Sequence, residues 1–362
     1  MSESGLMTRR RAVDLMTAVT EERRLLSEIM AEKLSDLAPA DRARAGRLTL
    51  GALRWAQRSD RVLGPYLRNK PEDPVMNTLR LAIFELFVTG AAPHGVVNDA
   101  VSLTPGKKAG MVNAVLRNVL RAQVSWDELP PPSLAKWLRK RAVAAWGKAA
   151  VAEIEAVVAG EPPLDLTSKG DPQELATRLG GTLLPTGSVR LTEPGQVSAL
   201  PRFAEGDWWV QDAAAALPAK VLDPKPGERV LDLCAAPGGK TMQLAAGTEV
   251  TALDVSDTRM ARLRENLART RLSAEIVVAD ALEWTPDAPF DAILLDAPCS
   301  ATGTLRRHPD LQYAKTGDEI APLTELQDRL IYRSLDWLKP GGRLVSVSYT
   351  HLTLPTTKAL GG

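Results

Sequence analysis

Short apolar segments alternate with amphipathic ones between about residues 221 and 347, and this alternation restricts the fold more than any other feature of the chain. Apolar segments of strand length that are separated by helices form right-handed βαβ units. Such units build a parallel sheet with helices on both faces. The predicted strands are 229–233, 248–254, 275–280, 290–296 and 343–347, and the predicted helices are 241–246, 256–270 and 322–338. We therefore expect an α/β domain over residues 206–349.

The preceding part of the chain has a different pattern. Between residues 8 and 125, apolar positions recur at spacings of three and four, which is typical of helices with one buried face. Proline and glycine interrupt these stretches, and the sequence predicts a compact all-α domain over 8–125. The proline run at 130–132 forms a stiff break. A helix over 134–158 and short apolar runs follow it, so residues 130–205 are predicted to be a small α+β connector.

Composition limits the class of protein. Of the 362 residues, 44% are hydrophobic and 25% are charged, as in ordinary globular proteins. No apolar run reaches the roughly 18 residues that a membrane span needs, and the N-terminus lacks the pattern of a signal peptide. Two cysteines give no disulfide framework and no C-x-x-C metal pair. We expect a monomeric cytoplasmic protein without a metal site and without membrane contact.

Charge is unevenly distributed along the chain. Residues 1–125 contain 19 Lys and Arg against 13 Asp and Glu, whereas residues 126–362 contain 26 against 31. A basic lobe joined to a mildly acidic one is the pattern of a domain that binds a polyanion beside a catalytic domain. A solvated helical surface that is rich in arginine would give the same count, so both interpretations remain open here.

The loop after the first predicted strand is rich in small residues. It reads Asp-Leu-Cys-Ala-Ala-Pro-Gly-Gly-Lys-Thr over residues 232–241. A phosphate-binding P-loop would need a glycine where Cys234 stands, and the dinucleotide pattern G-x-G-x-x-G fails because Gly238 and Gly239 are adjacent. What remains is a loop whose backbone a ligand can approach closely.

Acidic residues end three successive strands. Asp254 follows Asp232 by 22 residues, at the position where a carboxylate can hydrogen-bond both hydroxyls of a ribose. Asp280 is placed within reach of an adenine amino group, and Asp296 beside the reacting group. One such Asp could simply cap a helix, but three at neighbouring strand ends indicate a ligand site.

Two motifs resemble a known family. LDLCAAPGGKT (residues 231–241) and LLDAPCSATGT (residues 294–304) are similar to segments of the Sun family of RNA 5-methylcytosine methyltransferases. The helical part, with HGVVNDAV (residues 94–101) and VNAVLR (residues 112–117), resembles the NusB-like RNA-binding domain. Members with this pairing of domains methylate 16S ribosomal RNA. The resemblance runs from about residue 8 to about residue 345 and is weakest in the connector.

The resemblance implies a Rossmann-like fold that binds S-adenosylmethionine and a reaction at carbon 5 of a cytosine. Asp254 would hold the ribose and Asp280 the adenine, and Asp296 would sit between the cofactor and cytosine. Pro298 and Cys299 would contact the target base. The cofactor site would be lined by Cys234, Ala235, Ala236, Pro237, Gly238, Gly239 and Lys240.

Carbon 5 of cytosine is a weak nucleophile, so a thiolate must first add to carbon 6. Cys299, in its Pro-Cys motif, is in a suitable place, whereas Cys234 is expected to be a packing residue of the cofactor loop. The family uses a second cysteine, the attacking one, at the end of the last of the predicted strands, and Cys299 would assist product release. Here Tyr349 stands at that position, and a tyrosine with a reference pKa near 10 is a poor substitute.

The tail over residues 350–362 does not match the family, and three explanations are open. The tail could be an artefact joined to a truncated gene. The protein could be a degenerate form that binds RNA without methylating it. Cys299 could itself be the nucleophile, as the Pro-Cys thiol is in DNA cytosine-5 methyltransferases. A DNA enzyme is disfavoured because of the all-α domain and because no long insertion follows the fourth strand.

Two arginines after the second motif are candidates for RNA contact. Arg306 and Arg307 could meet phosphates, and the neighbouring His308 resembles a family segment near the substrate. The alternative is a solvated loop. His94, in the helical domain, is predicted to be structural.

Overall fold

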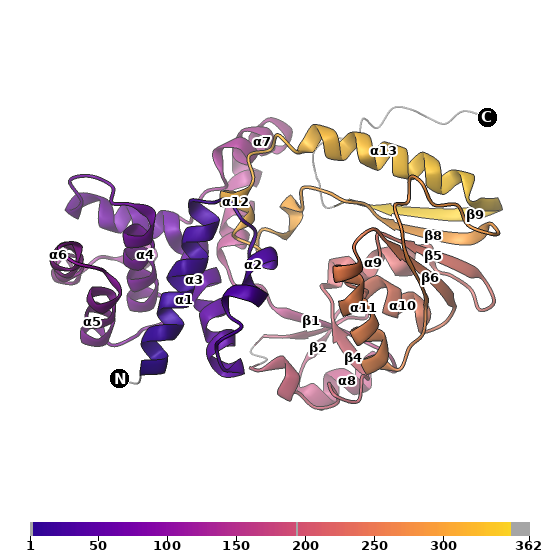
Figure 1. The fold of residues 1–362 in the computed structure, drawn as a ribbon, viewed down its shortest axis with the longest axis horizontal. Coiled ribbons are helices and arrows are strands. Elements are labelled where there is room, and N and C mark those ends of the chain that lie inside the picture. The colour runs from indigo at the N-terminus through magenta and orange to yellow at the C-terminus, as the bar shows by residue number, and fades with distance from the viewer. Residues whose placement is uncertain (1–2, 193–194, 349–362) are drawn as a thin grey trace. The chain divides into compact units, whose positions relative to one another are not determined.

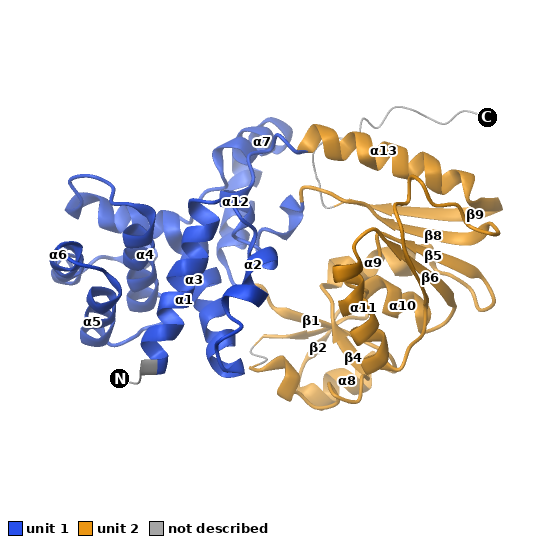
Figure 2. Ribbon diagram, in the orientation of Figure 1, with its two compact units in different colours: residues 1–161, 301–319, 352–362 blue, residues 162–300, 320–351 orange. Residues whose placement is uncertain are grey.

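A computed structural model describes residues 3–192 and 195–348, which form two compact units (Figures 1 and 2). Of these residues, 3–161 and 301–319 form the first unit, and 162–192, 195–300 and 320–348 form the second. None of the helices in the described ranges combines the length and the apolar character that crossing a membrane would require.

The first unit is helical. Two of its core clusters lie around Leu15 and Leu53 and around Leu79 and Leu116, all with no more than 1% of their surface exposed. A third surrounds Leu138 and Leu311. Its helices are α1 (Glu3–Thr20), α2 (Leu26–Lys33), α3 (Pro39–Leu63), η1 (Gly64–Tyr66), α4 (Asp73–Phe87), α5 (Pro93–Leu103), α6 (Lys108–Arg121), η2 (Trp126–Glu128) and α7 (Lys136–Ala159).

A buried ion pair joins two helices of this unit. Arg9 of α1 donates from Nη2 to Glu85 Oε1 (2.6 Å) and from Nε to Oε2 (2.8 Å), and Asp99 of α5 lies 3.5 Å from Nε. The two parallel bonds of an arginine and a carboxylate fix geometry as well as charge. The ion pair therefore sets how α1, α4 and α5 meet.

Residues 301–319, which contain η4 (Thr302–Thr304) and α12 (Leu311–Ala314), belong to the helical unit although the strands before and after them belong to the other. Asp310, 2% exposed, accepts a hydrogen bond from Leu26 N (3.0 Å). The Tyr313 hydroxyl donates to the Leu53 carbonyl (2.8 Å). These buried contacts attach the segment to α2 and α3.

The second unit begins with a small antiparallel sheet in the order β2-β3-β1-β4. Asp165 of β1 is 1% exposed; it pairs with Arg190 of β3 and accepts from Ala213 N at the start of the next helix. The elements are β1 (Leu164–Ser168), α8 (Pro172–Leu179), β2 (Thr182–Leu183), β3 (Val189–Leu191), η3 (Val197–Ala199), β4 (Trp208–Val210) and α9 (Ala213–Leu222).

A five-stranded parallel sheet follows in the order β7-β6-β5-β8-β9. Alternate residues of each strand point to opposite faces. Leu231 and Ile293 pack with Leu330 of α13 on one face, and Val230 and Leu294 pack with α9 and α10 on the other. The elements are β5 (Arg229–Leu233), α10 (Gly239–Ala245), β6 (Glu249–Asp254), α11 (Asp257–Thr270), β7 (Glu275–Val278), β8 (Phe290–Asp296), α13 (Ile320–Asp336) and β9 (Leu338–Val347).

The predicted fold class is confirmed, with corrections to some bounds. The third predicted strand ends at Val278 rather than at Asp280, because a turn capped by the Asp280 carboxylate begins there. The last predicted helix ends at Asp336, because Leu338 is already in β9 and pairs with Phe290 of β8. The register shifts after this pair: Gly341 and Gly342 bulge out of the ladder, and pairing continues from Arg343 opposite Ala292.

The compact units also divide the chain differently from the predicted bounds 8–125, 130–205 and 206–349. The helix α7 belongs to the first unit, while the small antiparallel sheet belongs to the second. The tail over 350–362 and Tyr349 lie outside the described residues.

Candidate active site

The site lies at the carboxyl edge of the parallel sheet. Strands β5 and β8 are hydrogen-bonded neighbours, with Leu233 opposite Leu295, so the loops that leave them start side by side. The chain from β5 leads outward to β6 and β7 on one side, and β8 and β9 lie on the other. Strand order therefore reverses between β5 and β8, which is where open α/β sheets bind ligands.

The loop after β5 turns sharply into α10. Cys234 has φ of 63° and Gly238 has φ of 101°, both in the left-handed region. A Cβ on Gly238 would lie 2.8 Å from Leu263 Cγ of α11, so this position needs a glycine for its conformation and for its packing. The next residue, Gly239, has no such constraint: its φ lies outside the left-handed region, and a Cβ there would lie 3.8 Å from Gln211 Cδ, an ordinary contact distance.

Asp254, at the end of β6, holds this loop in place. Its Oδ2 accepts from Ala236 N (3.1 Å) and its Oδ1 from Ser256 N (2.9 Å). The carboxylate is 2% exposed. A carboxylate has about four acceptor positions, so lone pairs remain beyond these two bonds. The predicted contact of Asp254 with a ribose stays a prediction, and the structure adds that Asp254 shapes the loop itself.

Lys240 and Asp296 form an ion pair across the two loops. Lys240 Nζ lies 2.7 Å from Asp296 Oδ2, with 10% and 30% of their side chains exposed. Asp296 is also the register partner of Val347 in β9, and the Ala297 N–H donates to the Val347 carbonyl (3.2 Å). Asp296 is therefore anchored between the cofactor loop and the end of β9.

The field at the site is acidic. Burial raises the pKa of Asp232 to about 7, against the hydrogen bond from Thr241 and the charge of Lys240, which lower it. Burial, together with the carboxylates of Asp254, Asp296 and Asp232, raises the pKa of the Cys234 thiol to about 12. Cys234 is therefore a neutral thiol, as expected of a packing residue. The same negative surroundings favour a ligand that carries positive charge.

Cys299 lies three residues beyond β8 and is partly buried. The Pro298 carbonyl before it accepts a hydrogen bond from Gln327 Nε2 of α13 (2.7 Å). This bond connects the backbone next to the thiol to α13, which packs on one face of the sheet. The position of Cys299 is therefore set by β8 and α13 together.

Asp280 is exposed, unlike the other two strand-end acids. Its Oδ1 accepts from Leu282 N (2.8 Å), and its carbonyl accepts from Trp284 N (2.8 Å). Asp280 thus caps a turn, and no helix begins there. Its predicted contact with adenine is left as a prediction.

Three residues of the site were not predicted. Val255 follows Asp254 and is 68% exposed, so it offers an apolar surface to a planar ring at the sheet edge. Arg259 of α11 donates to the Ala236 carbonyl and lies 3.6 Å from Asp254. An apolar residue directly after a strand-ending acid was a signal that the sequence offered for Val255. The spacing of Arg259 gave no signal of its contact with Ala236.

Gln211 is the third. Its Oε1 accepts from Thr167 Oγ1 (2.7 Å) and Trp209 Nε1 (3.0 Å), and its Nε2 donates to Gln243 Oε1 of α10 (3.1 Å). The side chain is 6% exposed. It links the small sheet to α10, the helix that follows the cofactor loop. A single glutamine between two elements carries no recognisable pattern in the sequence.

These features suit S-adenosylmethionine. Val255 offers an apolar surface to an adenine ring, and the acidic field favours a sulfonium cation. This strand order is shared by Rossmann-type folds, and because the loop at its reversal point lacks the G-x-G-x-x-G pattern of dinucleotide binding, the site fits an S-adenosylmethionine-dependent methyltransferase. Among the residues that the structure describes, no three His, Cys, Asp or Glu side chains are placed to hold a metal ion.

Comparison with known proteins gives the family. Residues 219–353 match the family described as 16S rRNA methyltransferase RsmB/F, and residues 7–121 match the NusB family. The chain is 35% identical over 379 residues to ribosomal RNA small subunit methyltransferase B of Pseudomonas syringae, which covers 95% of this chain and 83% of the relative. The protein of the same name from Vibrio cholerae is 34% identical over 355 residues, and the match covers 88% of this chain and 80% of that relative. The chain belongs to the RsmB/F family of 16S rRNA methyltransferases.

Solved structures agree with this fold. A methyltransferase homolog protein from Pyrococcus horikoshii is 30% identical with a TM-score of 0.51, over 64% of this chain and 76% of that chain. The crystal structure of PH0851 has a TM-score of 0.68 over 96% of this chain and 86% of that chain; at 22% identity it supports the fold alone.

The structure does not gather every predicted site residue in one place. Cys234 to Lys240, Asp254, Asp296 and Cys299 share the carboxyl edge of the sheet in the second unit. Arg306 and Arg307 belong to the first unit. Arg306 donates to the carbonyls of Gly160 (3.3 Å) and Glu161 (2.7 Å), so its guanidinium helps to attach the 301–319 segment. Contact of either arginine with RNA stays a prediction.

Proposed function

We propose that the site methylates carbon 5 of a cytosine in 16S ribosomal RNA, and that Tyr349 leaves this particular chain without the attacking thiol. The protein would act in the cytoplasm as a monomer. It would bind cofactor and RNA but transfer the methyl group very slowly. The observation that carries the proposal is the placement of the Pro298-Cys299 motif after β8, beside the cofactor loop that follows β5.

The chemistry needs a thiolate because carbon 5 is not nucleophilic enough by itself. Addition of a thiolate to carbon 6 makes carbon 5 enamine-like, and carbon 5 then takes the methyl group. Loss of the carbon-5 proton and of the thiolate releases the product. S-adenosylmethionine supplies the methyl group when bound, and the cytosine must first be turned out of its stack.

The residues of this chain would divide the work. Gly238 and Gly239 let the cofactor approach the backbone, and Asp254 would hold the ribose and Asp280 the adenine. Asp296, neutralised in part by Lys240, would stand between the cofactor and the base. Cys299 would contact the base and assist its release.

The missing step is the attack on carbon 6. The last register pair places Val347 opposite Asp296, and the predicted nucleophile position follows two residues later in the sequence. A phenol with a reference pKa near 10 is mostly protonated at neutral pH, and its oxygen is a weak nucleophile towards this ring. A chain with Tyr349 is therefore expected to stop before the covalent adduct.

Trapping with RNA that contains 5-fluorocytidine tests this step directly. Fluorine at carbon 5 cannot leave as a proton does, so a thiolate that has attacked carbon 6 stays bonded to the base after methyl transfer. We expect no denaturant-resistant protein–RNA complex for the chain as it stands or for the matched control Tyr349→Ser. We expect a complex that requires S-adenosylmethionine for Tyr349→Cys.

Two other functions give different results in this assay. A complex formed by the unchanged chain and lost in Cys299→Ala would make Cys299 the nucleophile. No complex with Tyr349→Cys, despite bound cofactor and RNA, would favour an RNA-binding protein that keeps the cofactor fold as a scaffold, and it would contradict the proposal.

A further inference from the structure

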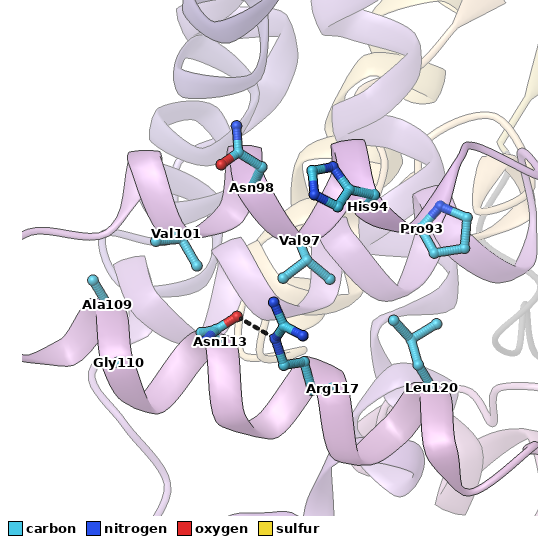
Figure 3. A pocket seen from close by; sticks show the side chains of 10 residues that line it. All are labelled: Pro93, His94, Val97, Asn98, Val101, Ala109, Gly110, Asn113, Arg117 and Leu120. Carbon is cyan, nitrogen blue, oxygen red and sulfur yellow. Dashed lines mark hydrogen bonds between the residues drawn. The ribbon is translucent and has the colours of Figure 1, made fainter.

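A groove lies between α5 and α6 of the helical unit, far along the chain from the cofactor loop. Its volume is about 450 Å³, within the roughly 300–1,000 Å³ of small-molecule sites. Figure 3 shows its side chains projecting from the two helices. The groove is lined by Pro93, His94, Val97, Asn98, Val101, Ala109, Gly110, Asn113, Arg117 and Leu120.

The groove combines an apolar floor with polar groups at its rim. Val97 and Leu120 supply apolar surface, while Asn98, Asn113 and Arg117 supply amide and guanidinium groups. Arg117 Nε donates to Asn113 Oδ1 (3.0 Å), which turns the guanidinium toward the groove (Figure 3). The exposed side chains of His94 and Asn98 have no hydrogen-bond partner among the described residues.

Gly110 keeps the groove open. It lies in the first turn of α6, and a Cβ built there would meet nothing within 4 Å. Its φ is not in the left-handed region, so the backbone does not need a glycine here. A larger side chain at 110 would occupy the groove without strain.

The exposed charges between Pro93 and Arg121 are all positive. From Pro93 to Arg121 the only acidic residue is Asp99, which is 4% exposed and lies 3.5 Å from Arg9. Lys108 pairs with Glu72. Lys107, Arg117 and Arg121 are exposed, and none of the three forms an ion pair with an acidic residue in the described part of the chain.

We infer that the α5–α6 groove binds one unstacked nucleotide of single-stranded RNA, with the base between the helices and the phosphates on Arg117 and Arg121. Amide groups can hydrogen-bond the edge of a splayed base, and apolar walls cover its face. Arginines on one helix can follow the phosphates. This inference rests on the proposed rRNA substrate and adds a second point of contact, on the compact unit that does not hold the reacting base.

The test measures RNA affinity of the full chain, using a fluorescent single-stranded RNA of about twelve nucleotides, a length in the range of single-strand binding sites. Gly110→Leu fills the groove, and Ala114→Leu adds the same side chain to an exposed position of α6 that does not line it. Exclusion of the base from the groove predicts at least about fivefold weakening for Gly110→Leu, the lower end of what one protein-bound base contributes. Ala114→Leu should stay within about twofold of the unchanged chain, since a substitution outside the groove removes no contact.

A second variant tests the phosphate contact. Arg117→Gln should weaken binding of all sequences alike and lower the slope of log affinity against log salt by about one. RNA carrying a photoreactive uridine should crosslink to residues between 93 and 121 in the unchanged chain, and the crosslink should disappear in Gly110→Leu.

Several results would overturn the inference. Unchanged affinity in Gly110→Leu would do so, as would equal loss in both leucine variants. A change in oligomeric state on filling the groove, with RNA affinity intact, would assign the groove to a protein partner. A failure of this inference can be distinguished from a failure of the proposed function. The 5-fluorocytidine trapping assay uses Tyr349→Cys with the α5–α6 groove unchanged, so its result does not depend on the affinities of the groove variants for the short RNA.

Discussion

Asp232 is the most constrained charged residue of the cofactor site. It is fully buried, its Oδ2 accepts from Thr241 Oγ1 (2.6 Å), and its Oδ1 has no hydrogen-bond partner among the described residues. Burial of the charged form raises its pKa from 3.8 to about 7. The folded protein therefore holds this proton at pH values where the unfolded chain has already released it.

The sign of the pH dependence follows. The contribution of Asp232 to the free energy of unfolding is fully present below about pH 4, where the carboxyl is protonated in both states. It is lost as the pH rises to about 7, because the unfolded chain releases the proton first. Asp232→Asn, which is neutral and still accepts from Thr241, should remove this loss. Between pH 4 and 8, we expect the unfolding free energy of Asp232→Asn to rise by roughly 4 kcal/mol relative to that of the unchanged chain.

Denaturant unfolding without cofactor at several pH values measures this difference. Asp257→Asn, on a side chain that is 72% exposed, is the control and should give a nearly constant difference. A constant difference for Asp232→Asn as well would mean that Asp232 is ionised in the folded protein throughout this range.

Among the elements, the turn from β5 into α10 limits cofactor binding most. Gly238→Ala would place a methyl group 2.8 Å from Leu263 Cγ at φ of 101°. The turn must open or α11 must move, and either change displaces the loop that Asp254 holds. We expect a loss of about 1–3 kcal/mol in stability and at least a tenfold loss in affinity for S-adenosylmethionine.

Gly247→Ala is the matched control, because a Cβ there meets nothing within 4 Å and its φ is not in the left-handed region. Calorimetric titration of the cofactor should separate the two variants. Equal affinities would show that the turn is not what positions the cofactor.

The segment 301–319 is the second element with a testable dependence. Asp310→Ala removes the acceptor of Leu26 N in a buried position, which costs about 1–3 kcal/mol for the unpaired donor. We expect the segment to detach more often and to be cut faster in limited proteolysis. Asp318→Ala, on an exposed side chain of the same segment, should leave the cutting rate nearly unchanged. Equal rates in both variants would contradict the role given to Asp310.

The sequence predicted the elements well because periodicity reports burial. The strands β5, β6 and β8 match their predicted bounds within one residue, since each has a buried and mostly apolar middle. The cofactor loop was predicted because its small residues and strand-end acids are local in the sequence. Asp254 was singled out for a ribose, but its bond from Ala236 N in the cofactor loop could not be read from a strand end.

At the scale of the whole molecule, the division into units could not be predicted. The helix α7 and the segment 301–319 join the helical unit through contacts such as Arg54 Nη1 with the Arg306 carbonyl (2.6 Å), which link residues 252 positions apart. No periodic pattern encodes such a pairing. Gln211 and Arg259 were missed for the same reason, since their roles depend on side chains from distant segments.

The chain thus carries two units of different charge, a basic helical one and a mildly acidic one with the cofactor site. The central claim is that the second of these units supports methylation at carbon 5 of cytosine and that one residue, Tyr349, interrupts it. Unmodified 16S rRNA treated with the Tyr349→Cys variant and S-adenosylmethionine, then digested to nucleosides and measured by mass spectrometry, tests this claim directly. The account predicts 5-methylcytidine with Tyr349→Cys and almost none with the unchanged chain. A methyl group on another atom or base, or equal amounts of 5-methylcytidine from both proteins, would contradict it.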